Sequence, residues 1–349
     1  MTKFSKKNLS IIFIICALVL SACSSKSTET VDLAFASIEA QEYDAALELL
    51  QTARENGEDE RQILRAEGIS NLGLGKYAEA IEKFEASLAA SEGTIVDMDY
   101  DINYYLATAY YKNGNADEAL KIYDTIISLE PGSVDAIYLK GVIIAEKNDL
   151  NQAMACFDQA IALAPENYDM LIQIYGILNE KGYQSEGQSY LKRALESGTK
   201  KMTNFEKGQI SFYLEDYESA KTYLEKAKDE DSYEAVLFLG KTYETLGDVN
   251  YAISVYTSYL NSGAQSPEVL NQMGLCKLSM GDYEGALSAF AEAMNIEGNG
   301  MMQTLKYNEI VAYEYLGDFK KACVLMESYL RSFPDDEAAK REYEFLKSR

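Results

Sequence analysis

One phrase of residues recurs along this chain and constrains its fold more than any other feature. In the copy at residues 281–293 it runs glycine, aspartate, tyrosine, and then small and large apolar residues at helical spacing. Related copies begin at Gly114, Gly247 and Gly317. A phrase that returns at a fixed period predicts an array of one structural unit, not a single irregular core.

The copies align on a small residue that opens the second half of each unit. The distances between successive members are 34, 39, 34, 34, 33, 32, 34 and 36 residues. Each aligned small residue is followed by a large residue four positions later. Most of the aligned residues are also preceded by another small residue twelve positions earlier. Small residues let two helices approach closely and the large residue fills the gap, so each unit is predicted to be a helical hairpin. The aligned small residues are Ala46, Ala80, Ala119, Ala153, Gly187, Ala220, Ala252, Ala286 and Ala322.

Residues that end or begin helices fall at the expected places in these units. Six glycines stand where the first helix should end, as C-terminal glycines do: Gly75, Gly114, Gly182, Gly247, Gly281 and Gly317. Six side chains that can cap a helix precede the second helix: Asn115, Asp149, Asp216, Asp248, Asp282 and Asp318. No proline interrupts a predicted helix.

A helix–turn–helix unit with a period of 34 resembles the tetratricopeptide repeat. The resemblance implies an all-α, right-handed α-solenoid of about nine repeats over residues 27–334, closed by a C-terminal capping helix within 335–349. Three residues depart from the pattern. Tyr175 stands at a small position, Gly187 replaces the anchor alanine of the same repeat, and Ile310 replaces another small residue. The 39-residue step also indicates an insertion of about five residues near Ser91–Asp99.

The N-terminus has the features of an export signal. Lys3, Lys6 and Lys7 precede an apolar run from Leu9 to Leu20, which is shorter than the roughly 20 residues that span a bilayer. Small residues then lead to a cysteine in the order Leu-Ser-Ala-Cys, which resembles the lipobox of bacterial lipoproteins.

The lipobox resemblance implies a signal peptide at residues 1–22 and acyl chains, typically palmitate among them, on Cys23. Residues 23–30 would form the lipidated start and a short polar tether. Several acyl chains give stable anchoring to a membrane. The predicted location is the extracytoplasmic face of the bacterial cell membrane or outer membrane. An ordinary secretory signal with an incidental cysteine is the alternative.

Charge and composition restrict the function classes. The chain carries a formal charge of −24, and residues 23–349 hold 29 basic against 56 acidic side chains. Such a surface repels phosphate backbones, so nucleic acid is not expected as a partner. The chain has no histidine, the commonest general base and transition-metal ligand. We therefore expect no catalytic residue, no cofactor, no metal, and no enzymatic activity.

The resemblance to tetratricopeptide repeats implies a groove lined by the first helices, where exposed aromatics often anchor peptides. Packing between repeats is the alternative role of each such residue. By position, the face includes Tyr104, Tyr111, Tyr138, Phe205, Phe212, Tyr307 and Tyr315. The paired lysine and asparagine with which some family members grip acidic C-terminal tails are absent from the innermost positions.

Two further features of the sequence are candidate sites. The segment Asp97–Asp101 begins like a calcium loop, but Ile102 stands where the turn glycine belongs, which favours a solvated acidic loop. Cys156, Cys276 and Cys323 are expected to be buried single thiols, with a Cys276–Cys323 bridge as the alternative.

The sequence therefore predicts a membrane-anchored scaffold or adaptor that binds a protein or peptide partner in the cell envelope. A glycan-active α/α-toroid hydrolase and a solute-binding lipoprotein are the alternatives from other classes.

Overall fold

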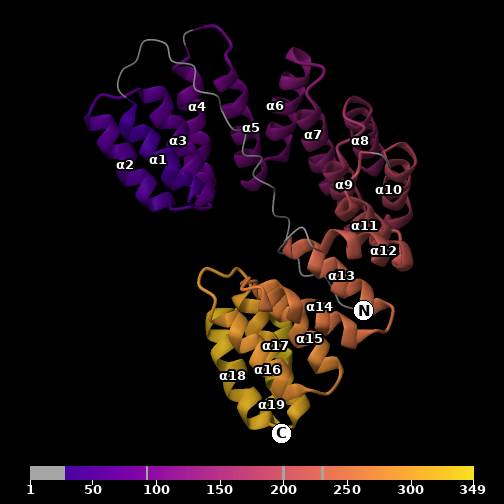
Figure 1. Ribbon diagram of the computed structural model, residues 1–349. Coiled ribbons are helices and arrows are strands. Elements are labelled where there is room, and N and C mark those ends of the chain that lie inside the picture. Colours follow the sequence, from indigo (N-terminus) through magenta and orange to yellow (C-terminus); the bar gives the residue numbers. More distant parts are fainter. Residues whose placement is uncertain (1–27, 92, 199–200, 229–231) are drawn as a thin grey trace. The chain divides into compact units, whose positions relative to one another are not determined.

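The computed structural model describes residues 28–91, 93–198, 201–228 and 232–349. Within these ranges the chain forms nineteen helices and no strand (Figure 1). The predicted all-α class is therefore confirmed for the described residues. The helices are α1 Glu29–Glu39, α2 Tyr43–Glu55, α3 Glu60–Gly73, α4 Tyr77–Ala89, α5 Asp97–Lys112, α6 Ala116–Leu129, α7 Val134–Glu146, α8 Leu150–Leu163, α9 Tyr168–Glu180, α10 Gln184–Gly198, α11 Asn204–Tyr213, α12 Tyr217–Ala227, α13 Tyr233–Thr245, α14 Val249–Asn261, α15 Pro267–Ser279, α16 Tyr283–Met294, α17 Met302–Leu316, α18 Phe319–Ser332 and α19 Glu337–Lys347.

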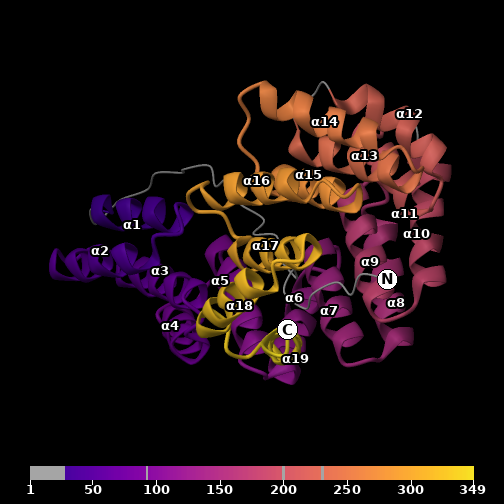
Figure 2. The same cartoon turned by 90° about the horizontal axis from the view of Figure 1, so that it is seen from below.

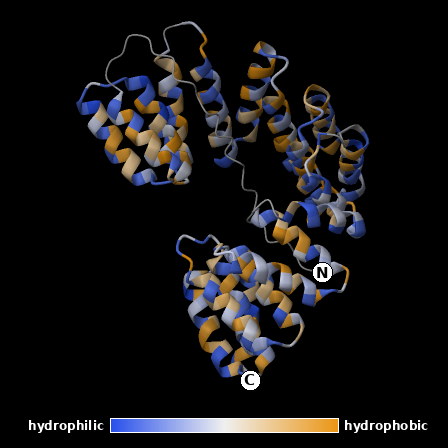
Figure 3. Ribbon diagram, in the orientation of Figure 1, coloured by the Kyte–Doolittle hydropathy of each residue, from blue (hydrophilic) through white to orange (hydrophobic). Residues whose placement is uncertain are grey.

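The chain divides into two compact units, one up to Cys156 and the other from Phe157 to Arg349. In the first unit α1 packs on α2 and α3, and α3 packs on α4 and α5 (Figures 1 and 2). In the second unit α11, α13, α15 and α17 pack on one another in order, and the even-numbered helices pack beside them. These first helices thus contact their neighbours in the chain and also the first helix of the next repeat, which is the arrangement of a helix-pair solenoid. Figure 3 shows hydrophobic and hydrophilic residues together on the helices of each unit.

In four of the repeats a glycine of the first helix lies directly against the large residue of the second, as predicted. The nine anchor residues of the second helices are all buried, from Ala46 to Ala322. A methyl group added to Gly240 of α13 would overlap the ring of Tyr256 on α14, and Gly274 lies as close to Phe290. The backbone of the first helix therefore rests directly on the large side chain of the second.

The fifth repeat reverses this arrangement. Tyr175 occupies the position of the small residue on α9 and is 7% exposed. It fits because Gly187 on α10 has no side chain there: a Cβ at Gly187 would lie 3.1 Å from Cδ2 of Tyr175 and 3.2 Å from its carbonyl oxygen. The two departures from the sequence pattern compensate each other.

The ninth repeat accommodates its departure in another way. Ile310 on α17 and Met326 on α18 are both buried in one apolar cluster. Methionine is unbranched and flexible, so it leaves room for the branched isoleucine where a phenylalanine would not.

The turns inside the repeats confirm most of the predicted caps. All six predicted C-terminal glycines have positive φ, for example 86° at Gly247. Five of the six predicted N-caps accept a backbone N–H, as Asp282 does from Gly285 at 3.0 Å. The prediction for Asn115 is wrong, because its side chain caps nothing. The N–H of Glu118 instead bonds to the main-chain carbonyl of Asn115 at 3.2 Å.

The last helix closes the second unit as predicted. Ala339 and Leu346 of α19 are buried in the same apolar cluster as Tyr329 of α18. Asp336 caps α19 by accepting the N–H groups of Ala338 and Ala339, and it also accepts the hydroxyl of Tyr329 at 2.7 Å. The start of α19 is thus fixed to the preceding helix.

The three cysteines of the array are free thiols. The alternative of a Cys276–Cys323 bridge is wrong, because Cys276 on α15 and Cys323 on α18 belong to different apolar clusters. Burial is the main cause that raises the pKa of the Cys276 thiol, followed by the nearby Glu244. This thiol is therefore protonated and inert at neutral pH.

In the fifth repeat the large residue stands on the first helix and the small residue on the second. Mutations at Tyr175 and Gly187 should therefore have coupled effects on the free energy of unfolding. Gly187→Ala should lower the free energy of unfolding by about 1–3 kcal/mol, because the new methyl group must displace the tyrosine. In a Tyr175→Ala background the same change should cost less, because the contact with Cδ2 is removed and only the contacts with the backbone of residue 175 remain. Urea unfolding of the four proteins measures the coupling. An equal cost in both backgrounds would show that the two residues do not compensate each other.

Candidate functional site

Three of the predicted groove residues lie in the first unit, Tyr104 and Tyr111 on α5 and Tyr138 on α7, and all are half-buried. The hydroxyl of Tyr104 lies 2.7 Å from Oγ of Ser133, and its ring centroid is 6.1 Å from that of Tyr123. Tyr104 and Tyr111 both pack against the apolar cluster that joins α5, α6 and α7. Burial raises the pKa of all three phenols, so they remain hydrogen-bond donors at neutral pH.

Phe205 and Phe212 of α11 belong to an aromatic cluster in the second unit. The ring of Phe238 on α13 lies 6.0 Å from that of Phe205 and 5.4 Å from that of Phe212, both edge to face. Tyr213 adds a further edge-to-face contact with Phe238 at 5.5 Å. Aromatic pairs at these distances are mutually attractive. Phe205 and Phe212 are half-buried, so they join adjacent repeats and keep only part of their surface for a partner.

Tyr307 and Tyr315, both on α17, differ in exposure. Tyr307 is half-buried and packs edge to face on Tyr329 at 5.8 Å. Tyr315 is 61% exposed, with its ring stacked on that of Tyr283 at 5.7 Å. A ring supported on one face and open on the other can receive a partner without a large loss of side-chain freedom. Tyr315 is therefore the best-presented of the seven predicted residues.

The structure places three of these residues in one unit and four in the other. Six of the seven are half-buried. The alternative role, packing between repeats, is seen for four of these six: Tyr104, Tyr111, Phe205 and Phe212. Their role in binding stays a prediction. Cys23 lies outside the described residues.

One carboxylate near Tyr315 lacks a partner. Glu314 of α17 has a buried Oε1 that makes no hydrogen bond with any described group. Burial, and then the charge of Glu342 on α19, raise the pKa of Glu314 to about 7. The pKa of Tyr307 is also raised, mainly by burial and then by the charges of Glu342 and Glu314. Glu314 is therefore only partly ionised at neutral pH.

The acidic segment Asp97–Asp101 forms the start of α5 and not a solvated loop, so that prediction is wrong, and Asp99 is buried. Asp99 is paired with Arg61, and it also accepts the N–H of Val96 at 2.8 Å. Asp101 pairs with Arg65 at 2.5 Å. Arginines from α3 thus already hold two of the carboxylates that the calcium alternative would use. The described residues contain no group of three or more possible ligands that could hold a metal ion.

A surface cavity of about 330 Å³ lies beside the predicted insertion. It is formed by the C-terminal ends of α4 and α6, the connection between α4 and α5, and the first turns of α5. The sequence indicated the insertion but not this cavity. The available signal was the pair of apolar residues Ile95 and Val96 inside an otherwise polar connection.

No helix in the described part of the chain combines the length and the apolar character needed to cross a membrane. The predicted signal peptide lies outside the described residues.

The raised pKa of Glu314 predicts a pH-dependent stability. A carboxyl whose folded-state pKa of about 7 exceeds its ordinary value of 4.5 favours folding in its protonated form. Its contribution is complete below the ordinary value and is lost as the pH rises through about 7. Glu314→Gln should therefore make the second unit more stable than the wild type at pH 8, with a smaller difference at pH 5. Urea unfolding at both pH values tests this. A difference that stays constant with pH would contradict it.

Comparison with known proteins shows which family models the chain matches. Models described as tetratricopeptide repeat match residues 71–143, 32–93 and 307–336, and another matches 134–167, 203–232 and 267–299. Together they cover more than half of the chain.

Curated relatives are distant and longer than the matched region. The BBSome complex member BBS4 of Bos taurus is 23% identical over 286 residues, which are 78% of this chain and 48% of that protein. The photosystem I assembly protein Ycf3 of Acaryochloris marina is 32% identical over 108 residues, 27% of this chain and 64% of that protein. The chain thus covers less than two thirds of either relative. A solved tetratricopeptide repeat protein of Parabacteroides merdae is 14% identical and covers 72% of this chain and 98% of its own, with a TM-score of 0.49.

Proposed function

The chain belongs to the tetratricopeptide repeat family, and on that premise we propose that it is a lipid-anchored scaffold that binds a protein partner at the surface of a bacterial membrane. One observation carries the binding role. In the first unit α1, α3 and α5 contact one another in order, and in the second unit α11, α13, α15 and α17 do the same. They form a continuous helical face of the kind on which the family binds protein partners.

The names of two relatives support a role in assembly. One relative is a member of a complex, and another is an assembly protein. Both descriptions agree with a chain that binds other proteins through its surface. The acidic balance of the sequence favours a neutral or basic partner.

The proposed scaffold acts without catalysis. The chain has no histidine, and the aromatic residues of the first helices serve packing and contact. Of the two alternatives, a solute-binding lipoprotein is usually built from two α/β lobes, whereas the described residues contain no strand. A glycan hydrolase would be supported by turnover of a polysaccharide that is lost when one carboxylate is replaced.

The proposed anchor depends on one thiol, that of Cys23. Cells grown with an alkyne analogue of palmitate should label the wild-type protein, and Cys23→Ser should abolish the labelling. Cys16→Ser is the matched control, because that cysteine lies inside the predicted apolar signal segment and should be irrelevant to acylation. Mass spectrometry should find an acylated Cys23 at the mature N-terminus. Labelling that survives Cys23→Ser would rule out this anchor.

The best-presented residue of the first helices provides a sharp test of the binding face. In-cell crosslinking followed by mass spectrometry would identify the partner, and Tyr315→Ala should weaken its binding about tenfold or more, the size of effect found for aromatic hot spots. The matched control is Tyr251→Ala. Tyr251 is 47% exposed and contacts another tyrosine, as Tyr315 does, but it lies on a second helix, α14.

Calorimetry then measures the affinity of the purified partner for the wild type and for each of the two variants. Loss in Tyr315→Ala alone would locate partner binding on the first helices. Equal losses in both variants, or none in Tyr315→Ala, would place the partner elsewhere.

A further inference from the structure

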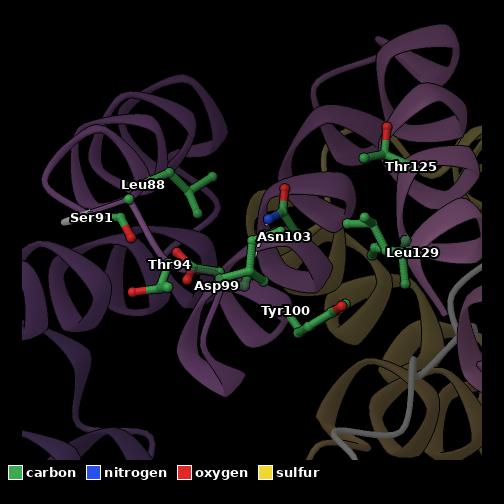
Figure 4. Close-up of a pocket in the computed structure, with 11 residues that line it drawn as sticks. Leu88, Ser91, Thr94, Asp99, Tyr100, Asn103, Thr125 and Leu129 are labelled. Atoms are coloured by element: carbon green, nitrogen blue, oxygen red, sulfur yellow. Dashed lines mark hydrogen bonds between the residues drawn. The ribbon is translucent and has the colours of Figure 1, made fainter.

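The cavity beside the insertion is built from three segments of the first unit. Leu88 near the end of α4 faces it from one side and Leu129 at the end of α6 from the other, with Tyr100 and Asn103 of α5 between them (Figure 4). The connection from α4 to α5 contributes Ile95. This connection covers residues 90–96, whereas the one between α8 and α9 covers only 164–167. The longer connection, between α4 and α5, forms one wall of the cavity. The shorter connection, between α8 and α9, has too few residues to form such a wall.

The walls of this cavity are more apolar and more exposed than a solvated loop requires. Ile95 is 59% exposed and Leu129 is 52% exposed, while Ile126 forms a buried floor at 2%. Val96, next to Ile95, is 44% exposed. Large apolar side chains that gather at one exposed hollow mark an interaction site more often than isolated ones do.

The surroundings of the cavity are negative. Glu130 directly follows the lining residue Leu129, and Asp97 follows the lining residue Ile95 by two positions; both carboxylates are exposed, and neither takes part in an ion pair with a described residue. The C-terminus of α6 adds to this potential. Glu130 donates its N–H to Ile126, but no described backbone N–H reaches the carbonyl groups of residues 127–129. Pro131 follows and has no N–H to offer. Free carbonyl groups at a helix end carry partial negative charge.

From this combination we propose that the cavity is a docking site for a short protein segment that carries a few apolar side chains flanked by lysine or arginine. The apolar side chains fill the space between Leu88, Ile95 and Leu129. The basic side chains lie at the edge, against Asp97 and Glu130. The volume of about 330 Å³ is at the lower end of the range of about 300–1,000 Å³ for ligand sites, which suits a peptide segment and not the face of a folded domain. The site lies in the first unit, whereas Tyr315 belongs to the second.

Selection of peptides on the whole chain tests both the ligand class and the place. The probe is a phage-displayed library of random dodecapeptides. Four further proteins are used alongside the wild type: Ile95→Ser with Leu129→Ser, Asp97→Asn with Glu130→Gln, Tyr315→Ala, and the control Leu163→Ser. Leu163 is the matched position of the next repeat, ten residues after its anchor as Leu129 is, and it is 47% exposed. Circular dichroism and thermal melting confirm that each variant is folded.

The wild type should enrich peptides that combine apolar and basic residues. A synthetic peptide of that consensus, followed by fluorescence anisotropy, should bind at least tenfold more weakly to the double serine variant. It should bind with wild-type affinity to Leu163→Ser and to Tyr315→Ala. Asp97→Asn with Glu130→Gln should weaken binding at low salt, with a smaller effect at high salt.

Four results would overturn the proposal. They are the absence of any enrichment, an acidic or purely polar consensus, wild-type affinity in the double serine variant, and an equal loss in Leu163→Ser. Loss of binding in Tyr315→Ala alone would assign the peptides to the first-helix face, and this too would overturn the proposal.

Discussion

Close approach of two helices over one large side chain is the contact on which most of the repeats depend. Where Gly240 meets Tyr256, the first helix has no side chain and the second supplies a whole ring. The buried hydroxyl of Tyr256 donates to Glu244 at 2.7 Å, so the ring is placed without leaving a polar atom unpaired. A single hairpin cannot bury the rest of its apolar surface, and stacking of neighbours completes the core. The order of the helices and the positions of the turns follow from this contact.

Much of the fold was predictable because its determinants are local and periodic. The anchors from Ala46 to Ala322, the left-handed glycines and five of six N-caps could be placed from spacing alone. The prediction failed at Asn115, where a main-chain carbonyl takes the N–H that the side chain would have capped. The departures at Tyr175 and Gly187 were visible in the sequence, but that they compensate each other depends on how two helices face one another across a turn.

The candidate sites were less predictable, because exposure depends on what neighbouring repeats cover. The spacing assigns Tyr104 and Tyr315 to the same kind of face, yet Ser133 bonds to one and the other is largely open. The apolar cavity in the first unit depends on three segments, including the ends of α4 and α6, which are far apart in the sequence. No single stretch of sequence carries that information.

The pairing of small and large residues has a consequence for how such a chain can change over generations. The first helix of the fifth repeat carries Tyr175 and tolerates only a partner like the helix that carries Gly187. Joined to a second helix with an alanine at that position, it would meet a methyl group where it now has space. The two helices of a repeat are therefore inherited as a matched set. Gain or loss of material is tolerated in whole hairpins of about 34 residues, and a recombination point within the turn of a hairpin would separate residues fitted to each other.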